Sequence, residues 1–234
     1  MESGGLEEKI KVLTEALEKQ EAKVKMLTET AEKQETRLQK AEDIEAIKKL
    51  QRSYCYYLEH WQDEEIIGLF SHSPDVSIEI NDAGQYKGWE EVKIWFPFAD
   101  HHTAFGVKKA PPEFLHLLIP LSGIVDIDPD GVRAKGRWYG FGLSALPREG
   151  KLQALIGCGI WENDYVKEDG KWKILKLFYN DIISSPIDKG WVKKPWMRPT
   201  DLPQTPPSVR NPHFAPYPSG TIFPYHYKNP VTGK

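Results

Sequence analysis

The side chains of this sequence that could carry acid–base chemistry are one histidine on a predicted strand and a group of rings on a predicted helix. His116 stands in the apolar run Phe-Leu-His-Leu-Leu-Ile. Tyr54, Tyr57 and His60 fall within two turns of one helix. A histidine can act as a base and then as an acid near neutral pH, and a tyrosine is a well-positioned hydrogen-bond donor. We take these four side chains as catalytic candidates, with Tyr57 ahead of Tyr54 and His60 as a helper. A hydrogen-bonded core histidine is the alternative for His116.

A predicted hairpin over residues 161–181 supplies the candidate binding residues. Asp169-Gly170 between β-forming residues is typical of a type I′ turn, because both turn residues need a positive φ. Counting outward from this turn, Trp161 would lie opposite Phe178. Side chains alternate along a strand, so Trp161, Phe178 and Asn180 would share one face. The predicted substrate-binding residues are Trp161, Asn180, Phe178 and Trp138. An ordinary hairpin that ends at a hydrogen-bonded asparagine is the alternative.

Two carboxylates leave a different chemistry open. An isomerase would need a carboxylate base facing the interior, and Glu59 or Asp181 would fill that role. The same strand counting places Asp181 on the side opposite to Trp161. A non-catalytic scaffold or ligand-binding protein is a further alternative, in which the interior would be filled and dry.

The composition argues against several classes of protein. The formal net charge is −3, from 31 basic and 34 acidic residues, and no basic stripe predicts a nucleic-acid partner. Cys55 and Cys158 lie in no metal-type or Cys-x-x-Cys spacing, which favours a reducing, cytoplasmic setting. No apolar run has transmembrane length, so no membrane partner is expected. The adjacent pair His101-His102 lacks a spaced carboxylate, and no phosphate loop or dinucleotide fingerprint occurs. We therefore expect neither a metal nor another cofactor.

The first 43 residues predict an oligomerisation helix. Residues 6–41 carry a heptad pattern with mostly Glu, Lys, Gln and Thr between the apolar positions, which is typical of a coiled coil. Gln20 and Gln34 interrupt the d positions. No second heptad segment follows in the chain, so we expect the partner to be another copy. A single solvated helix lying across its own domain is the alternative. The apolar seam consists of Leu6, Ile10, Leu13, Leu17, Val24, Leu27, Ala31, Leu38 and Ala41.

The order of the remaining elements predicts an α+β domain over residues 44–190. Two helices, a short strand pair and a third helix precede three long antiparallel strands, which together would form a cone-shaped curved sheet packed on helices. Such a cone is a natural pocket. Residues 191–234 form a proline-rich extension that also contains several aromatic residues. Disordered tails are usually poor in aromatics, so we expect this extension to dock on the same domain or on a neighbouring copy.

Three motifs carry a resemblance to a known family. They are the helix motif Tyr-x-x-Tyr-Leu-Glu, the strand Phe-Leu-His-Leu-Leu-Ile-Pro-Leu and the hairpin Trp-Glu-Asn-Asp-Tyr-Val-Lys-Glu-Asp-Gly-Lys-Trp. Over about residues 44–186 the chain resembles a SnoaL-like member of the nuclear transport factor 2-like superfamily. This resemblance implies a cone-shaped α+β barrel, and the family's enzymes include scytalone dehydratase, bile acid 7α-dehydratase and ketosteroid isomerase. The ending Pro-Tyr-His-Tyr-Lys-Asn-Pro resembles a bacterial subgroup with lyases that remove formaldehyde from lignin-derived diarylpropane diols.

The resemblance also implies roles for particular residues. The dehydratases use tyrosines near the end of the first helix, which correspond to Tyr54 or Tyr57, and a histidine on the strand where His116 stands. His60 is similar in place to a second histidine of the bile acid enzyme. Scytalone dehydratase has an asparagine at about Trp161 and a further histidine on the strand 132–146, where this chain has none. This difference argues against a copy of the two-histidine mechanism of scytalone dehydratase. The resemblance to trimeric dehydratases also implies a homotrimer.

Taken together, the sequence predicts a cofactor-independent lyase of aromatic compound catabolism. The expected reaction eliminates water, as in a dehydratase, or formaldehyde from a hydroxylated aromatic small molecule. The expected partners are that substrate and further copies of the same chain.

Overall fold

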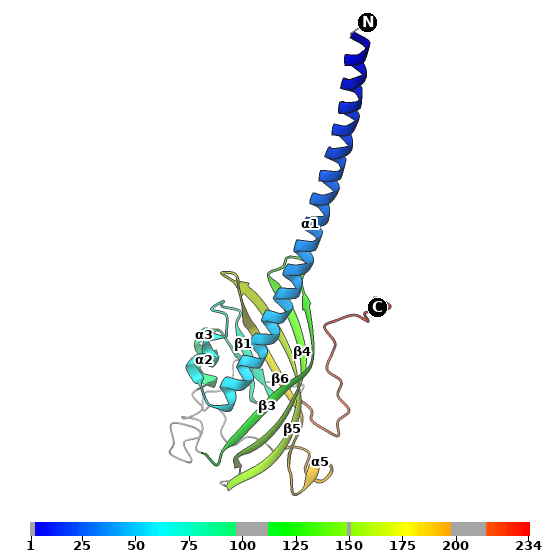
Figure 1. Cartoon of the computed structure of the whole chain (residues 1–234). Helices are drawn as coiled ribbons and strands as arrows, with labels where there is room; N and C mark the ends of the chain where they lie inside the picture. The colour runs from blue at the N-terminus through cyan, green and yellow to red at the C-terminus, as the bar shows by residue number, and fades with distance from the viewer. Residues whose placement is uncertain (1–2, 97–111, 149–150, 198–213) are drawn as a thin grey trace. The chain divides into compact units, whose positions relative to one another are not determined.

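The computed structural model describes residues 3–96, 112–148, 151–197 and 214–234 (Figure 1). The chain divides into two compact units, Met1–Asp43 and Ile44–Lys234. The first unit is helical throughout its described part and belongs to α1, which runs over Ser3–Glu59. Within the described residues, no helix is both long and apolar enough to cross a membrane.

The apolar seam predicted on α1 is open to solvent. Seven of its leucine, isoleucine and valine side chains are between 54% and 68% exposed. Such a narrow stripe gains stability only when another helix covers it, so the coiled coil stays a prediction that requires further chains. The seven exposed residues are Leu6, Ile10, Leu13, Leu17, Val24, Leu27 and Leu38.

The second unit is built around one six-stranded mixed sheet. The strand order is β2-β1-β6-β5-β4-β3; β1 is parallel to β6 and every other neighbouring pair is antiparallel. Asp169 and Gly170 have φ values of 49° and 75°, which confirms the predicted turn between β5 and β6. The strands are β1 (Ser77–Ile80), β2 (Gly84–Lys87), β3 (Leu115–Ile127), β4 (Arg133–Arg148), β5 (Lys151–Glu168) and β6 (Lys171–Pro186).

Helices cover one face of this sheet, which we call the inward face (Figure 1). They are the Ile44–Glu59 part of α1, α2 (Asp63–Gly68) and α3 (Trp89–Trp95), while η1 (Asn81–Ala83) links β1 to β2 and α5 (Gly190–Lys193) follows β6. A single buried cluster joins apolar side chains of these helices to Trp138, Trp161 and other residues of the long strands. The α+β class, with a curved sheet packed on helices, is therefore confirmed.

A polar network lies inside this core between α1 and β5. The Gln51 side-chain oxygen accepts hydrogen bonds from the Asn163 amide at 2.9 Å and from the Tyr165 hydroxyl at 3.0 Å. The oxygen of Asn163 accepts the backbone N–H of Phe178 at 3.0 Å. Because each buried polar group needs a partner, this network fixes the helix against the sheet. Cys55 lies beside it, and burial raises the pKa of its thiol.

Two β-bulges in β6 change the predicted register. Pairing follows the prediction from Glu168–Lys171 to Tyr165–Ile174, but Asp164 then pairs with Lys176, so Leu175 is an extra residue. A second shift follows between Cys158 and Gly159. A bulge leaves one residue unpaired and reverses the faces of those that follow.

The predicted binding face is therefore wrong in part. Trp161 lies opposite Tyr179 and not opposite Phe178. Tyr179 and Trp161 share the inward face, with ring centroids 4.9 Å apart. Phe178 points to the opposite, outward face, and Asn180 shares that side by alternation. Asn180 is nevertheless buried.

The described part of the C-terminal extension packs on the outward face of the same chain's sheet. The Tyr217 backbone N–H donates to the Ile182 carbonyl at 2.8 Å. Further on, Phe223 is buried against Phe178, with ring centroids 6.2 Å apart. We call residues Thr221–His226 the strap.

Candidate functional site

His116 lies on the inward face of β3. It alternates with Phe114 and Leu118, both of which pack against the core cluster. Its neighbour across the strand pair is Ser144 of β4. The strand therefore directs His116 to the side of the sheet that the helices cover, as a catalytic role requires.

An aromatic contact brings the end of the first helix to the start of β3. The rings of Trp61 and Phe114 pack edge to face with centroids 5.7 Å apart. Tyr57 lies in the last turn of α1, four residues before Trp61, which follows the helix end. His116 lies two residues beyond Phe114 on the same strand face. Tyr57 is half-buried and contacts the core cluster. The fold thus directs Tyr57 and His116, the two preferred catalytic candidates, toward the same end of the interior.

The other two catalytic candidates lie differently. Tyr54 is buried, and its ring packs edge to face against Phe96 at 6.4 Å. Burial raises the pKa of the Tyr54 hydroxyl far above its ordinary value. His60 follows the end of α1 and is exposed. The position of Tyr54 is that of a core residue, and the position of His60 is that of a surface residue.

A group that the sequence analysis did not select lies on the inward face of β6. The Tyr179 hydroxyl donates a hydrogen bond of 3.0 Å to one carboxylate oxygen of Asp181. The other oxygen accepts the side-chain N–H of Asn81 at 2.8 Å, and the Asn81 side-chain oxygen accepts the Asp181 backbone N–H at 2.7 Å. The carboxylate is thereby held in one orientation.

The electrostatics of this group keep Tyr179 protonated. Burial raises the pKa of its hydroxyl well above the ordinary value, and the nearby charge of Asp181 raises it further. A tyrosine that donates to a fixed carboxylate can accept a hydrogen bond from a substrate hydroxyl. Tyr179 and Asp181 can therefore orient such a hydroxyl or receive its proton.

Two tryptophans line the inward face beside Tyr179. Trp138 and Trp161 are cross-strand neighbours on β4 and β5, and both are buried. Trp138 packs edge to face on Tyr165 at 5.8 Å. Among the described residues, the indole N–H of Trp161 has no hydrogen-bond partner. These rings make an apolar wall suited to an aromatic body.

Gly157 leaves one position of the inward face between His116 and Tyr179 without a side chain, whereas the Leu118 side chain lies over Gly142, 3.2 Å from where a Cβ would stand. Gly142 of β4 lies opposite Gly157 of β5. The next inward-facing pair along these strands is Gly140 and Gly159, and the Tyr179 ring lies over it. A Cβ on Gly157 would meet only two backbone oxygens, at 3.9 and 4.0 Å. Because Ser144 and Gly140 are four residues apart on β4, the backbone positions of His116 and Gly159 are offset by about 13 Å along the strands and by two strand spacings, about 10 Å, across the sheet.

The bulge explains why Tyr179 and Asp181 were missed. An unbroken hairpin register turns both side chains away from Trp161. The only trace of the bulge in the sequence is the pair Ile174-Leu175, two adjacent apolar residues in a strand, both of which are buried.

The metal prediction can be compared only with the part of the chain that is described. There, no group of three or more His, Cys, Asp and Glu side chains could hold a metal ion. The His101-His102 pair lies outside the described residues.

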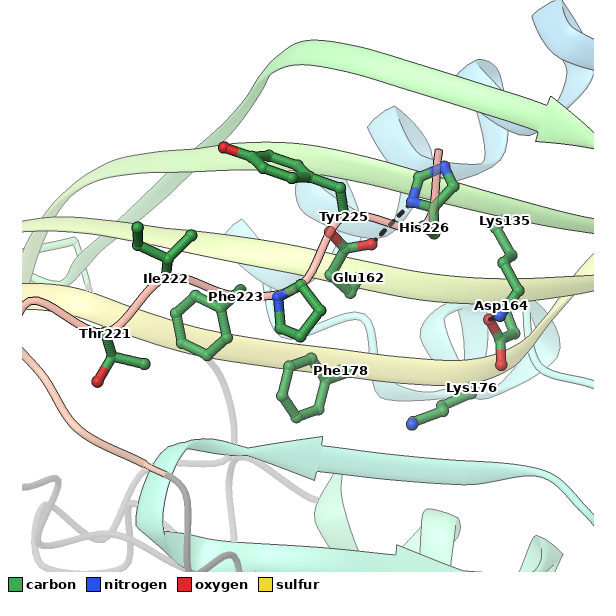
Figure 2. A pocket seen from close by; sticks show the side chains of 11 residues that line it. Lys135, Glu162, Asp164, Lys176, Phe178, Thr221, Ile222, Phe223, Tyr225 and His226 are labelled. Carbon is green, nitrogen blue, oxygen red and sulfur yellow. Dashed lines mark hydrogen bonds and ion pairs between the residues drawn. The ribbon is translucent and has the colours of Figure 1, made fainter. Parts of the chain in front are cut away.

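Phe178 contributes to a separate groove on the outward face (Figure 2). The strap and the outward side chains of β4, β5 and β6 enclose a volume of about 630 Å³. Phe178 therefore belongs to a different surface from Trp161, Trp138 and His116.

Sequence comparison decides the family. The profile of the SnoaL-like domain family matches residues 39–177, which is more than half of the chain. The chain belongs to the SnoaL-like domain family. The matched range contains His116, Tyr57, Trp161 and the first bulge. None of the curated proteins matches the sequence significantly.

Several solved structures are similar to this SnoaL-like protein. A candidate scytalone dehydratase from Novosphingobium aromaticivorans has 17% identity and a TM-score of 0.50, over 63% of this chain and 89% of the other. A hexachlorocyclohexane dehydrochlorinase from Novosphingobium barchaimii has 18% identity and a TM-score of 0.49, over 64% and 93%. A Mycobacterium tuberculosis protein of unknown function has 20% identity and a TM-score of 0.45, over 61% and 73%. At these identities the likeness concerns the fold alone.

Proposed function

We propose that this SnoaL-like protein is a lyase that eliminates water or formaldehyde from a hydroxylated aromatic small molecule, without a cofactor. The observation that carries the proposal is the inward face of the sheet. His116 lies at one end, the Tyr179–Asp181 pair lies at the other, and Gly157 leaves the floor between them without a side chain at that position. Trp138 and Trp161 supply an aromatic wall beside this floor.

The spacing suits a substrate with two rings or one ring and a hydroxylated side chain. The backbone at the two polar ends is offset by about 13 Å along the strands and about 10 Å across them, and the side chains of His116 and Tyr179 span part of this separation. One molecule could therefore contact His116 and Tyr179 together. The diarylpropane diols suggested by the C-terminal resemblance have this length and carry the required hydroxyls.

The proposed steps balance with the chain's own groups. The phenol of a para-hydroxylated substrate gives its proton to water and expels the benzylic hydroxyl, which Tyr57 protonates so that it leaves as water. A quinone methide remains, and Tyr57 regains its proton from solvent. His116 then takes the proton of the primary hydroxyl. The carbon–carbon bond breaks, formaldehyde departs, and the released electron pair restores the aromatic ring. Tyr179 and Asp181 orient a substrate hydroxyl, the role that an unbulged register would give to Asn180. Positioning and acid–base catalysis supply the rate.

The test is turnover of a para-hydroxylated diarylpropane diol by the purified protein. New conjugated absorbance and trapped formaldehyde would report the elimination. We expect the His116→Gln variant to lose about 10²-fold in turnover, the usual scale for a lost acid–base group. His60→Gln is the matched control, because His60 is exposed, and we expect it to stay within about twofold of the parent.

A folded His116→Gln protein with full turnover would refute the assignment of His116. Absence of both products with every para-hydroxylated diaryl and hydroxynaphthalene substrate tried would refute the lyase proposal itself.

A proton-transferring isomerase is the second candidate. The observation in its favour is the inward Asp181 carboxylate, which Asn81 and Tyr179 hold in place. A positioned carboxylate can move a proton beside a carbonyl group. The two reactions differ in mass balance, because an isomerase product keeps the mass of its substrate and a lyase product does not. Mass spectrometry of the product mixture therefore separates them.

We also propose that the protein works as a homo-oligomer, with three chains favoured. The exposed seam of α1 needs partner helices, as described above. A second exposed apolar surface lies on the outward face of β3 and β4, where five large side chains are 37–47% exposed. Monomeric proteins rarely leave apolar patches of this kind open. The five residues are Leu115, Ile119, Leu121, Ile124 and Tyr139.

The proposed setting is the cytoplasm. Its support is that Cys55 and Cys158 are both free thiols, as expected where the redox conditions are reducing. Fractionation of cells that make the full chain tests this placement, and recovery with the extracytoplasmic fraction would contradict it.

A further inference from the structure

The outward groove lies between the strap and the outward face of β4, β5 and β6. Its floor is aromatic, since Phe178 from β6 and Phe223 from the strap pack edge to face at 6.2 Å (Figure 2). Its volume of about 630 Å³ lies in the range of small-molecule sites. It lies on the opposite side of the sheet from Trp161, so it is separate from the proposed catalytic interior.

A charged cluster holds the strap in place. Arg137 forms an ion pair with Glu162 and donates to the carbonyls of Phe223 at 3.4 Å and Pro224 at 3.2 Å. His226 contacts the second Glu162 oxygen at 2.9 Å through Nδ1. The side chains of Arg137, Glu162 and His226 are all mostly buried. Their charges are therefore used to fix the strap and are not offered to a ligand.

Asp126, which lies outside the groove lining, holds the other ring nitrogen of His226 at 3.3 Å. Among the residues that do line the groove, the charge without an ion-pair partner is positive. The acidic residues that line the groove are Glu162 and Asp164. Lys135 forms an ion pair with Asp164 at 3.3 Å and so neutralises its charge. Lys176 has no carboxylate within 4.0 Å among the described residues, and its ammonium lies 5.4 Å from the Phe178 ring centroid. One uncompensated cation thus stands at the edge of an aromatic floor.

We propose that this groove is a second binding site and that it takes an aromatic carboxylate. The ring would pack on Phe178 and Phe223, where edge-to-face contacts are favourable. The carboxylate would pair with Lys176, which a neutral or cationic ligand could not do. The site is independent of the elimination reaction, because none of its lining residues lies on the inward face.

Calorimetric titration of the full-length protein with naphthoate tests the site. We expect Lys176→Gln to weaken binding about fivefold, the upper range for a partly exposed ion pair. Lys176→Arg should keep the affinity within about twofold of the parent, because the charge remains. Lys171→Gln is the matched control, since Lys171 is exposed on the same strand outside the groove, and it should bind like the parent protein. Naphthamide should bind more weakly than naphthoate and show no dependence on Lys176.

The inner site needs a separate control, because it is also expected to take aromatic molecules. His116→Gln should leave the affinity for naphthoate unchanged. Equal affinity of the parent and Lys176→Gln proteins would overturn the proposal, as would loss of binding in His116→Gln or no measurable binding of naphthoate by the parent.

Discussion

The Tyr179 hydroxyl and the Asp181 carboxylate form a hydrogen bond of 3.0 Å on the inward face of β6. Both residues point inward because Leu175 is an extra residue in that strand. The pair lies over Gly159, where any side chain would displace it: a Cβ there would stand 2.5 Å from the Tyr179 ring and hydroxyl. An oriented carboxylate and a hydrogen-bond donor are thus fixed beside Gly157, which lies on the inward face between them and His116.

Removing the Tyr179 hydroxyl should impair catalysis more than folding. In Tyr179→Phe the ring can still pack on Trp161, but the substrate hydroxyl loses its partner. We expect turnover of a para-hydroxylated diarylpropane diol to fall about tenfold, the scale of one lost positioning hydrogen bond. Tyr139→Phe, on the exposed outward side of β4, is the control. Steady-state kinetics of the two variants would settle the role, and equal turnover in both would count against Tyr179.

The two inward glycines of β5 should respond differently to alanine. Gly157→Ala adds a methyl group that meets only backbone oxygens at ordinary contact distance. We expect its free energy of unfolding to change by less than about 0.5 kcal/mol, while KM rises because the floor is occupied. Gly159→Ala drives Tyr179 from its place and should cost about 1–3 kcal/mol. Urea unfolding with steady-state kinetics checks both. Unchanged KM in Gly157→Ala would show that substrate does not use this floor.

Alkaline pH should destabilise the second unit. Burial raises the pKa of Cys55, Tyr54, Tyr165 and Tyr179 above their ordinary values of 9.0 and 10.0. The folded state therefore keeps protons that the unfolded state releases, so stability is complete below these ordinary values and is lost as pH rises through and above them. We expect the free energy of unfolding to begin falling near pH 9 and to fall more steeply above pH 10. Denaturant melts across this range measure it, and Tyr54→Phe should flatten the steeper part.

The coiled-coil proposal predicts that assembly depends on the seam and not on apolar character in general. Replacing Leu13 and Leu27 with Asp puts charge into two d positions and should dissociate the oligomer. Replacing Val12 and Met26 with Asp removes equally exposed apolar side chains that lie off the seam and should leave it intact. Light scattering gives the mass of each particle. The same mass for both double variants would exclude the seam as the assembly surface.

The sequence predicted the fold through local signals and failed where the outcome depended on packing between strands. Asp169-Gly170 has the turn chemistry of a hairpin, and the order of helices and strands followed from periodicity. The bulge at Leu175 has no turn residue to mark it, since Ile174 and Leu175 are both buried apolar residues. The placement of His116 on the inward face could be predicted from alternation with Phe114 and Leu118. The partnership of Asp181 with Asn81, a hundred residues earlier in the chain, could not.

The paired bulges of β6 also affect how residues of this chain correspond to those of its relatives. Consider a homologue that lacks the bulge. Each residue between Leu175 and the second register shift faces the opposite side of the sheet from the homologue's residue at the same distance from the turn. An alignment that runs through this stretch without a gap would match an inward residue of one protein to an outward residue of the other. Functional assignments transferred across Lys176–Asp181 to relatives without the extra residue therefore require a gap opposite Leu175. Deleting Leu175 would remove the bulge and leave Tyr179 opposite Trp161.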